Sequence, residues 1–317
     1  MGDADAQSDR GAVVVTGSCG RLGRRLVRRL HRTRRVIGLD RRPFPDRPAD
    51  VDHHELDLRS ARVRDVFRED VSALVHLGVM HDPRGDSVEN HAWNVTALQK
   101  LLEHVEHFQV KKVVLLSSAN VYGPRPDNAQ FLNEDAPLLG AGPFSEIRGL
   151  VELDMFCQSV FWKQPAVETV ILRPAHILGT VKNAPSNYLR LSVVPTLLGF
   201  DPMVQAVHQD DVVTAIAAAL EPGRKGIFNL AGPPPVPLSR AIELLGRKAL
   251  PVPHSLARVG VDRLFRLRIT SFPAPELDFI RYVCMVDDAR ARRALDFAPA
   301  HDLLATLRAV DEERWID

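Results

Sequence analysis

The chain is poor in tyrosine and in cysteine, each of which occurs only three times in 317 residues. The cysteines, Cys19, Cys157 and Cys284, lie far apart and lack the spacing of metal ligands, which favours free thiols in a cytoplasmic protein. A long apolar run is also missing, because no stretch approaches the roughly 18 residues that a membrane span needs. We therefore expect a cytoplasmic protein with no membrane partner.

An excess of charge of either sign is absent as well. The 41 basic and 40 acidic residues give a net charge of +1, so the composition does not favour a nucleic-acid partner or an anionic membrane. The twelve histidines include the pair His53 and His54, but no second cluster nearby in the sequence completes a metal site, and we expect no metal. Residues 1–10 are polar and typical of a disordered leader.

Apolar residues make up 45% of the chain, which is enough for a buried core, and their pattern predicts the class of fold. Strand-like and helix-like segments alternate through the first half, as in a parallel sheet with crossover helices. The expected strands are residues 11–17, 36–40, 51–58, 73–78, 111–118, 167–173 and 226–230. The expected helices are residues 21–31, about 88–105 and 145–162, and residues 236–317 are expected to be mostly helical.

A glycine turn follows the first expected strand. Gly17, Gly20 and Gly23 lie between that strand and the first helix, where Arg21 and Leu22 also fall. Gly17 permits a tight turn, Gly20 lets the backbone approach a pyrophosphate, and Gly23 lets the helix pack on the strand. The start of the helix offers N–H groups and a partial positive charge to phosphate. This pattern indicates a dinucleotide site.

Asp40, at the end of the second expected strand, points to NAD as the dinucleotide. A carboxylate there accepts hydrogen bonds from both ribose hydroxyls and repels the 2′-phosphate of NADP. Arg41 and Arg42 argue in the other direction, because either could hold that phosphate. The sequence therefore favours NAD over NADP without excluding NADP.

With these residues the chain resembles the extended short-chain dehydrogenase/reductase family, the NAD-dependent epimerases and dehydratases that act largely on nucleotide sugars. The resemblance covers most of the chain and rests on ordered short motifs. They are Thr16-Gly17-x-x-Gly20-x-x-Gly23, Asp57-Leu58-Arg59, His76-Leu77-Gly78, Asn94-Val95-Thr96, the segment Ser117 to Gly123, Leu172-Arg173-Pro174 and His208-Gln209-Asp210-Asp211-Val212.

The resemblance implies an α/β fold, with a Rossmann-type doubly wound parallel sheet and a smaller, mostly helical C-terminal substrate lobe. The dinucleotide-binding domain would comprise residues 11–173 and 205–231, and the lobe residues 174–204 and 232–317. Besides the glycine loop and Asp40, the resemblance implies further cofactor contacts. These are Asp57, Leu58, Leu77, Gly78, Asn94, Arg148 and Pro174. A homodimer is implied too, paired through the helix after the fourth strand and the helix that begins near residue 145.

The catalytic pair of that family is missing. The family uses a serine to polarise the substrate oxygen, which maps to Ser118, although a serine at a strand end can instead bond only to the backbone. Its acid/base is a Tyr followed four residues later by a Lys, and these positions hold Phe144 and Arg148. Phe144 has no proton to give, whereas Arg148 can still hold ribose hydroxyls. None of the three tyrosines has a Lys four positions later.

Two histidines could replace the missing acid. His81 follows the fourth expected strand and His176 the sixth, although either could be structural or exposed instead. Asn187 and Arg190 could bind phosphate oxygens of a nucleotide substrate, or simply belong to a polar loop that enters a helix. We therefore expect an atypical NAD-binding oxidoreductase or epimerase-like enzyme that acts on a carbonyl or secondary alcohol of a small molecule, with a nucleotide sugar as one candidate. The alternative is a non-catalytic NAD(H) sensor or scaffold.

Overall fold

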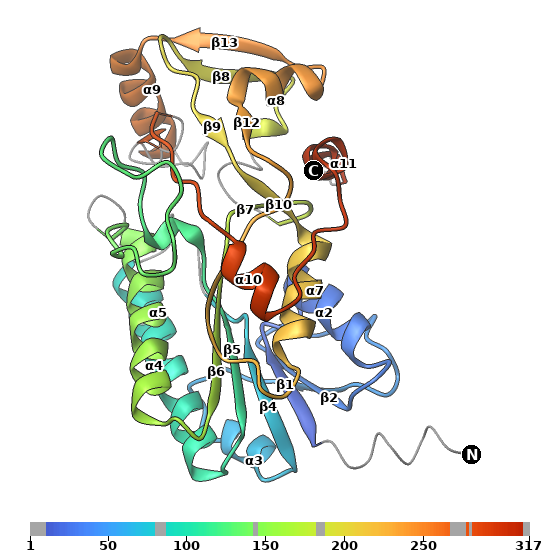
Figure 1. Cartoon of the computed structure of the whole chain (residues 1–317). Helices are drawn as coiled ribbons and strands as arrows, with labels where there is room; N and C mark the ends of the chain where they lie inside the picture. The colour runs from blue at the N-terminus through green and yellow to red at the C-terminus, as the bar shows by residue number, and fades with distance from the viewer. Residues whose placement is uncertain are drawn as a thin grey trace.

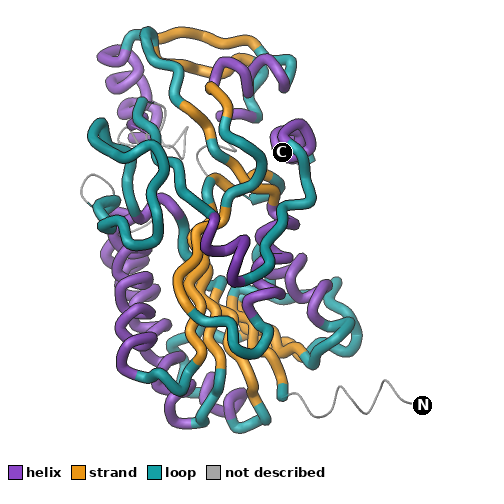
Figure 2. The backbone as a smooth tube through the Cα atoms, viewed as in Figure 1, coloured by secondary structure: helices purple, strands orange, loops and turns teal. Residues whose placement is uncertain are grey.

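The computed structural model describes residues 11–79, 87–141, 145–181, 188–266, 277–278 and 281–312. A seven-stranded sheet lies at the centre, with the strand order β11-β6-β5-β4-β1-β2-β3 and every pair parallel. Its strands, in chain order, are β1 (Ala12–Thr16), β2 (Val36–Asp40), β3 (Asp52–Glu55), β4 (Val71–His76), β5 (Lys112–Leu116), β6 (Glu168–Pro174) and β11 (Gly226–Leu230). The strands β1, β2, β4, β5 and β6 are almost wholly buried because helices cover both faces (Figures 1 and 2).

Each face of the sheet has its own apolar core. On one face α2 (Arg21–Leu30), α7 (Gln209–Ala219) and α10 (Ala289–Ala294) pack against the strands. On the other face lie α3 (Val63–Phe67), α4 (Ser87–His107) and α5 (Ser145–Lys163). The predicted doubly wound parallel sheet is therefore confirmed, and the expected strands and helices of the first half are all present to within a few residues.

A smaller lobe stands over the carboxyl ends of the strands (Figure 1). It contains α8 (Leu238–Leu244), α9 (His254–Arg266) and α11 (Leu303–Arg308), which the short 3₁₀ turn η3 (Ala309–Asp311) follows. It also contains three two-stranded ladders, which pair β7 (His176–Leu178) with β10 (Ala206–His208), β8 (Val193–Leu197) with β13 (Lys248–Val252) and β9 (Met203–Val204) with β12 (Val236–Pro237). The sequence did not predict β13, because its five residues, four of them exposed and one a proline, carry no alternating pattern.

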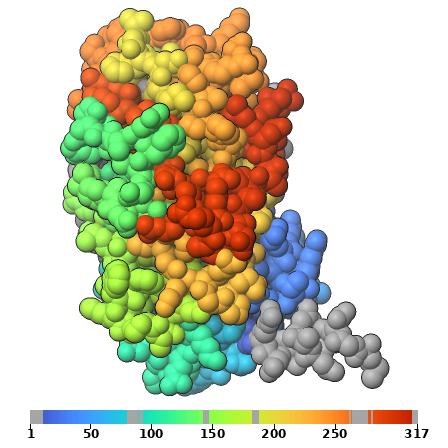
Figure 3. All heavy atoms as spheres, viewed as in Figure 1, coloured from blue at the N-terminus to red at the C-terminus, as the bar shows by residue number. Residues whose placement is uncertain are grey.

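The C-terminal segment does not stay within the lobe. Ala291, Leu295 and Phe297 belong to the same buried cluster as α2 and α7. In Figure 3 the last part of the chain, in red, lies across the middle of the visible face. The C-terminal segment therefore joins the lobe to the sheet. The predicted division of the chain into two domains stays a prediction. No helix in the described part of the chain is long and apolar enough to cross a membrane.

Candidate functional site

The glycine loop lies at the carboxyl end of β1 and leads into α2. Gly17 has a φ of +69°, and a side chain there would bring its Cβ to 2.9 Å from the backbone of Gly78. A Cβ on Gly23 would lie 2.1 Å from the carbonyl oxygen of Gly17. The loop, the helix and the end of β4 therefore pack with no room for side chains. The positive end of the α2 dipole faces this loop, as a pyrophosphate site requires.

Asp40 ends β2 beside the loop, as predicted. Its carboxylate accepts hydrogen bonds from the backbone N–H of Cys19 (3.0 Å) and of Arg42 (3.1 Å), and the Arg42 side chain pairs with both of its oxygens. Burial alone would raise the pKa of Asp40, but the hydrogen bonds and charge of Arg42 outweigh it, so the pKa is lowered. The carboxylate is therefore ionised at neutral pH, which fits an acceptor for ribose hydroxyls.

Asp57 follows β3, so it lies at the carboxyl ends of the strands, as Asp40 does. Arg59 pairs with the carboxylate of Asp57 at 2.9 Å, and its hydrogen bonds lower the pKa of Asp57 to about 2 despite partial burial. The indole N–H of Trp93, on α4, also donates to this carboxylate (3.4 Å). The guanidinium of Arg41 lies 5.4 Å from the centre of the Trp93 ring. Asp57 thus holds the Trp93 ring in place from one side, and Arg41 lies over that ring.

A cavity of about 340 Å³ lies between the glycine loop, Asp40 and Trp93. It is lined by predicted residues from the glycine loop, β2 and the segments after β3 and β4, together with neighbours that were not predicted as NAD contacts. The lining residues are Gly17, Gly20, Leu39, Asp40, Arg41, Arg42, Leu58, Leu77, Gly78, Val79 and Trp93. Trp93 was missed, and the available signal was its position directly before Asn94 in a motif that the family uses. The glycine cradle and the ionised carboxylate beside it fit a dinucleotide.

A hydrogen-bond relay holds the end of β4 against β1. The Thr16 hydroxyl accepts the N–H groups of Leu77 (3.2 Å) and Gly78 (3.1 Å) and lies 2.8 Å from Nδ1 of His76. Burial lowers the pKa of His76 to about 4, so its ring is neutral at pH 7 and accepts the Thr16 proton at Nδ1. This relay fixes the backbone of Leu77 and Gly78 at the cavity wall.

Ser118 follows β5 and begins a short 3₁₀ turn, η1 (Ala119–Val121). Its Oγ accepts the N–H of Asn120 at 3.1 Å, which is the backbone-bonding alternative left open by the sequence. That bond uses a lone pair of the hydroxyl and leaves its proton for donation to a substrate oxygen. The catalytic role of Ser118 therefore stays a prediction that its geometry permits.

Tyr122 is held in a buried polar network and is not available as an acid. Its hydroxyl donates to Oδ1 of Asn229 (2.8 Å) and accepts from Arg173 (2.8 Å). Burial raises the pKa of Tyr122 to about 12, against the opposing effect of Arg173. Arg173 in turn pairs with Asp154 on α5 at 2.7 Å, and the two side chains are 1% and 0% exposed. The network fastens the segment after β5 to β6, β11 and α5.

The remaining predicted residues differ in their burial and in their contacts. Asn94 is buried on α4, and Pro174 is buried at the end of β6. Arg148 is exposed near the start of α5 and forms no ion pair with any residue that the structure describes. Arg190 donates to the carbonyls of Gly179 and Val310, so backbone oxygens already use part of its guanidinium.

Three predicted residues, Phe144, His81 and Asn187, lie outside the described residues, and their roles stay predictions. His176 begins β7 and is half-buried. Desolvation lowers its pKa to about 4, so the imidazole is neutral at pH 7 and has only its N–H to donate.

Comparison with known proteins agrees with this geometry. The family model for the NAD dependent epimerase/dehydratase family matches residues 13–231. An uncharacterised protein of Mycobacterium bovis and one of Mycobacterium tuberculosis are each 29% identical over 305 residues, which covers 90% of this chain and 80% of theirs.

Solved structures share the fold over nearly the whole chain. A UDP-glucose 4-epimerase from Thermotoga maritima with UDP-glucose and a UDP-glucuronic acid 4-epimerase from Bacillus cereus with NAD each align with a TM-score of 0.73 at 18% identity, over 95% of this chain and 98% of theirs. A dTDP-glucose 4,6-dehydratase from Bacillus anthracis with NAD aligns with a TM-score of 0.71 at 18% identity, over 95% of this chain and 96% of its own.

Proposed function

The chain belongs to the NAD-dependent epimerase/dehydratase family, and we propose that it is an epimerase-like oxidoreductase that acts on a secondary alcohol or carbonyl of a nucleotide sugar. The observation that carries the proposal is the cavity between the glycine loop and the ionised Asp40, which suits NAD, the cofactor of the family. The nucleotide-sugar class is supported by the ligands of similar folds, UDP-glucose in one and UDP-glucuronic acid in another.

In this proposal some residues bind NAD and one polarises the reacting oxygen of the substrate. The glycine loop and the start of α2 hold the pyrophosphate, and Asp40 holds the adenosine ribose. Trp93, whose indole N–H donates to Asp57, lies at the adenine end. Arg148 would hold the nicotinamide ribose and Ser118 would donate a hydrogen bond to the reacting oxygen. Bound NAD supplies the hydride acceptor. Alignment of donor and acceptor by these contacts accelerates the reaction even where a general acid is weak.

The proton donor is the unusual part of the proposal. Removing a general acid typically costs about 10²–10⁴ in rate, and Phe144 cannot serve as one. Burial raises the pKa of Tyr188 and of Tyr122, so neither phenol is a substitute. His81 and His176 remain the proposed alternatives, with His176 limited to the weakly acidic N–H of a neutral ring.

The same observations support a second candidate, a non-catalytic sensor or scaffold that binds NAD(H). A sensor needs a cavity that binds the dinucleotide, and it does not need the family's catalytic tyrosine, whose predicted position holds Phe144. The two functions differ in one measurable property: only an enzyme moves hydride between NADH and a substrate.

Transfer of label from hydride-labelled NADH to a panel of UDP- and dTDP-sugars and small ketones separates the two. We expect transfer to a 4-keto nucleotide sugar that falls in Ser118→Ala and is unchanged in Ser192→Ala, an exposed serine in the lobe. A double substitution, Phe144→Tyr with Arg148→Lys, should raise the rate by about 10²–10⁴ if the rest of the site is ready for sugar chemistry. If the wild type and the double variant both bind NADH tightly and neither transfers label to any substrate, the protein is the sensor.

We also propose that the chain pairs with a second copy through α4 and α5. Met155 and Trp162 on α5 are 57% and 76% exposed, which is unusual for large apolar side chains. Trp162→Glu should shift the protein toward the monomer in sedimentation equilibrium, whereas a wild-type protein that is already monomeric would contradict the pairing.

A further inference from the structure

Two side chains from distant parts of the sequence are layered at one end of the dinucleotide cavity. The guanidinium of Arg41, which follows β2, lies over the ring of Trp93 on α4, 5.4 Å from its centre. Both side chains line the cavity. Trp93 is 5% exposed and belongs to the apolar core on one face of the sheet, whereas Arg41 is exposed. The guanidinium is therefore the outer layer of this Arg41–Trp93 pair, and the indole is its support.

The carboxylate of Asp57 is fully occupied by neighbours within the protein. Its Oδ1 accepts the backbone N–H of Arg59 (2.8 Å) and Nε of the same residue (3.1 Å). Its Oδ2 accepts Nη2 of Arg59 (2.9 Å) and the indole N–H of Trp93 (3.4 Å). An ionised carboxylate offers about four lone-pair sites, so each has a donor. Leu58 lines the cavity, whereas Asp57 is not among the described residues that do.

A planar guanidinium with an aromatic ring behind it is a surface on which a flat base can stack. Nucleobases stack on arginine planes as well as on aromatic rings. Stacking uses the π-face of the base and not its hydrogen-bonding edge, so it discriminates little between bases. Arg41 directly follows Asp40, the residue assigned to the adenosine ribose, which places this surface beside the base.

We propose that the adenine of NAD is held by stacking on Arg41, that Trp93 supports Arg41, and that Asp57 positions Trp93 without contacting the base. The inference rests on the proposed NAD site and extends it to the choice of base. The sequence counted Asp57 among the cofactor contacts, and its role here is an indirect one. Since the Asp57 carboxylate does not read the amino group of adenine, the cavity accepts a purine dinucleotide whose base lacks that group.

The first test compares two dinucleotides on the wild type by isothermal titration calorimetry. They are NAD and nicotinamide hypoxanthine dinucleotide, in which a carbonyl oxygen replaces the amino group of the base. The two dissociation constants should agree within about threefold, because both bases offer the same stacking face. A carboxylate that accepted the amino group would lose a hydrogen bond to a charged group, and the hypoxanthine dinucleotide would bind about 10- to 150-fold more weakly. That result would overturn the proposal without any variant.

Substitutions of Arg41 separate stacking from charge. Arg41→Ala and Arg41→Lys should each weaken binding of both dinucleotides by about 5- to 150-fold, since lysine keeps the charge but lacks the flat surface. Arg62→Ala is the matched control, because Arg62 is exposed before α3 and is not among the described residues that line the cavity. Wild-type affinity in Arg41→Ala would overturn the stacking role, and so would wild-type affinity in Arg41→Lys.

A double-mutant cycle tests whether Asp57 acts through Trp93. Asp57→Asn weakens the hold on the indole N–H, and Trp93→Phe keeps an aromatic ring but removes that N–H. Each should weaken both dinucleotides by the same factor, and the loss in the double variant should not exceed the larger single loss. Additive losses, or a loss confined to NAD in Asp57→Asn, would mean that the carboxylate reads the base directly.

Failure of this inference is distinct from failure of the proposed function. Discrimination against the hypoxanthine dinucleotide by a wild type that transfers hydride label would overturn the base site alone. A wild type that binds both dinucleotides equally but transfers no label would contradict the oxidoreductase and support the base site. A wild type that binds neither dinucleotide would overturn both.

Discussion

Replacement of Asp40 by Asn should reverse the cofactor preference of this protein. The carboxylate is 8% exposed, ionised, and accepts two backbone N–H groups that keep it in place beside the cavity. The asparagine side chain in this variant would keep one acceptor oxygen for the N–H of Cys19 and lose the charge. The change therefore removes recognition of the ribose hydroxyls while the loop keeps its main hydrogen bond.

The size of the effect follows from the lost interactions. A hydrogen bond to a charged group contributes about 1.5–3 kcal/mol, so the loss of one weakens NAD binding by about 10- to 150-fold. A carboxylate about 4 Å from a 2′-phosphate costs up to about 4 kcal/mol at an effective dielectric constant near 20, and this repulsion disappears. Arg42, released from Asp40, becomes a partner for the phosphate. NADP should bind at least tenfold more tightly.

Isothermal titration calorimetry with NAD and NADP measures both dissociation constants. Asp52→Asn is the matched control, because Asp52 lies at the amino end of β3 and pairs with Arg35 on the surface. It should leave both constants unchanged. Equal NAD affinity in Asp40→Asn and the wild type, in a variant with unchanged circular dichroism, would refute the assignment of the ribose site to this carboxylate.

Three further changes test the frame around the cavity. Asp154→Asn leaves Arg173 buried without its charged partner and should cost about 3–5 kcal/mol in urea-induced unfolding. Gly23→Ala would press a Cβ against a carbonyl and should abolish NAD binding by calorimetry, whereas Gly260→Ala, in open space on α9, should stabilise by about 0.5–1 kcal/mol. The pKa of His76 is about 4 in the folded chain and 6.5 as a free group, so the unfolding free energy should fall as the pH drops from about 6.5 to 4, less so in His76→Gln.

The outcomes that would contradict these three expectations are equally direct. Asp65→Asn removes an exposed ion pair with Arg68 and should change stability by less than about 0.5 kcal/mol, so an Asp154→Asn effect of similar size would mean that the buried pair contributes little. NAD binding by Gly23→Ala would show that the loop can open. An unchanged pH slope in His76→Gln would mean that the ring is not held neutral in the folded state.

The sequence predicted those features that short, continuous segments determine. Apolar runs located the strands, and the glycines placed the loop because only a residue without Cβ fits between β1, α2 and Gly78. Asp40 was found because a carboxylate at the end of the second strand has a fixed relation to that loop. Trp93 was not, since its contact with Asp57 depends on how α4 packs across the sheet.

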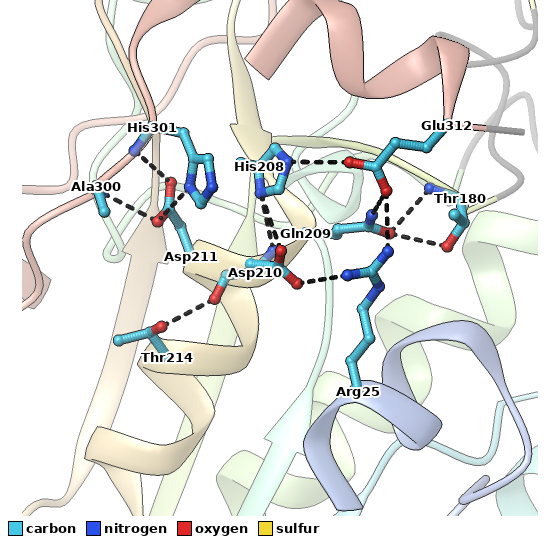
Figure 4. Close-up of polar contacts among 10 residues, drawn as sticks. All are labelled: Arg25, Thr180, His208, Gln209, Asp210, Asp211, Thr214, Ala300, His301 and Glu312. Atoms are coloured by element: carbon cyan, nitrogen blue, oxygen red, sulfur yellow. Dashed lines mark hydrogen bonds and ion pairs between the residues drawn. The ribbon is translucent and has the colours of Figure 1, made fainter. Parts of the chain in front are cut away.

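Features made by distant segments were beyond the sequence for the same reason. The packing of Phe297 with α2 and α7 joins the C-terminal segment to the core, although its sequence neighbours read as part of the lobe. The ladder of β8 with β13 and the stacked rings of His208 and His301 (Figure 4) likewise bring together residues that no local pattern relates. Periodicity describes one element at a time, whereas these contacts depend on the path between elements.

The buried network after β5 can hold the segment around Ser118 in place without supplying a proton. Arg173 and Asp154 hold Tyr122 in place, and burial raises the pKa of that phenol to about 12, so it stabilises the segment from Ser118 onward without giving up a proton. The segment that begins at Ser118 is therefore fixed by buried contacts with β6, β11 and α5. The sequence predicts that Phe144 stands at the position of the family tyrosine. If it does, a proton donor is removed while this network stays, which is why the double variant Phe144→Tyr with Arg148→Lys tests the proposed sugar chemistry.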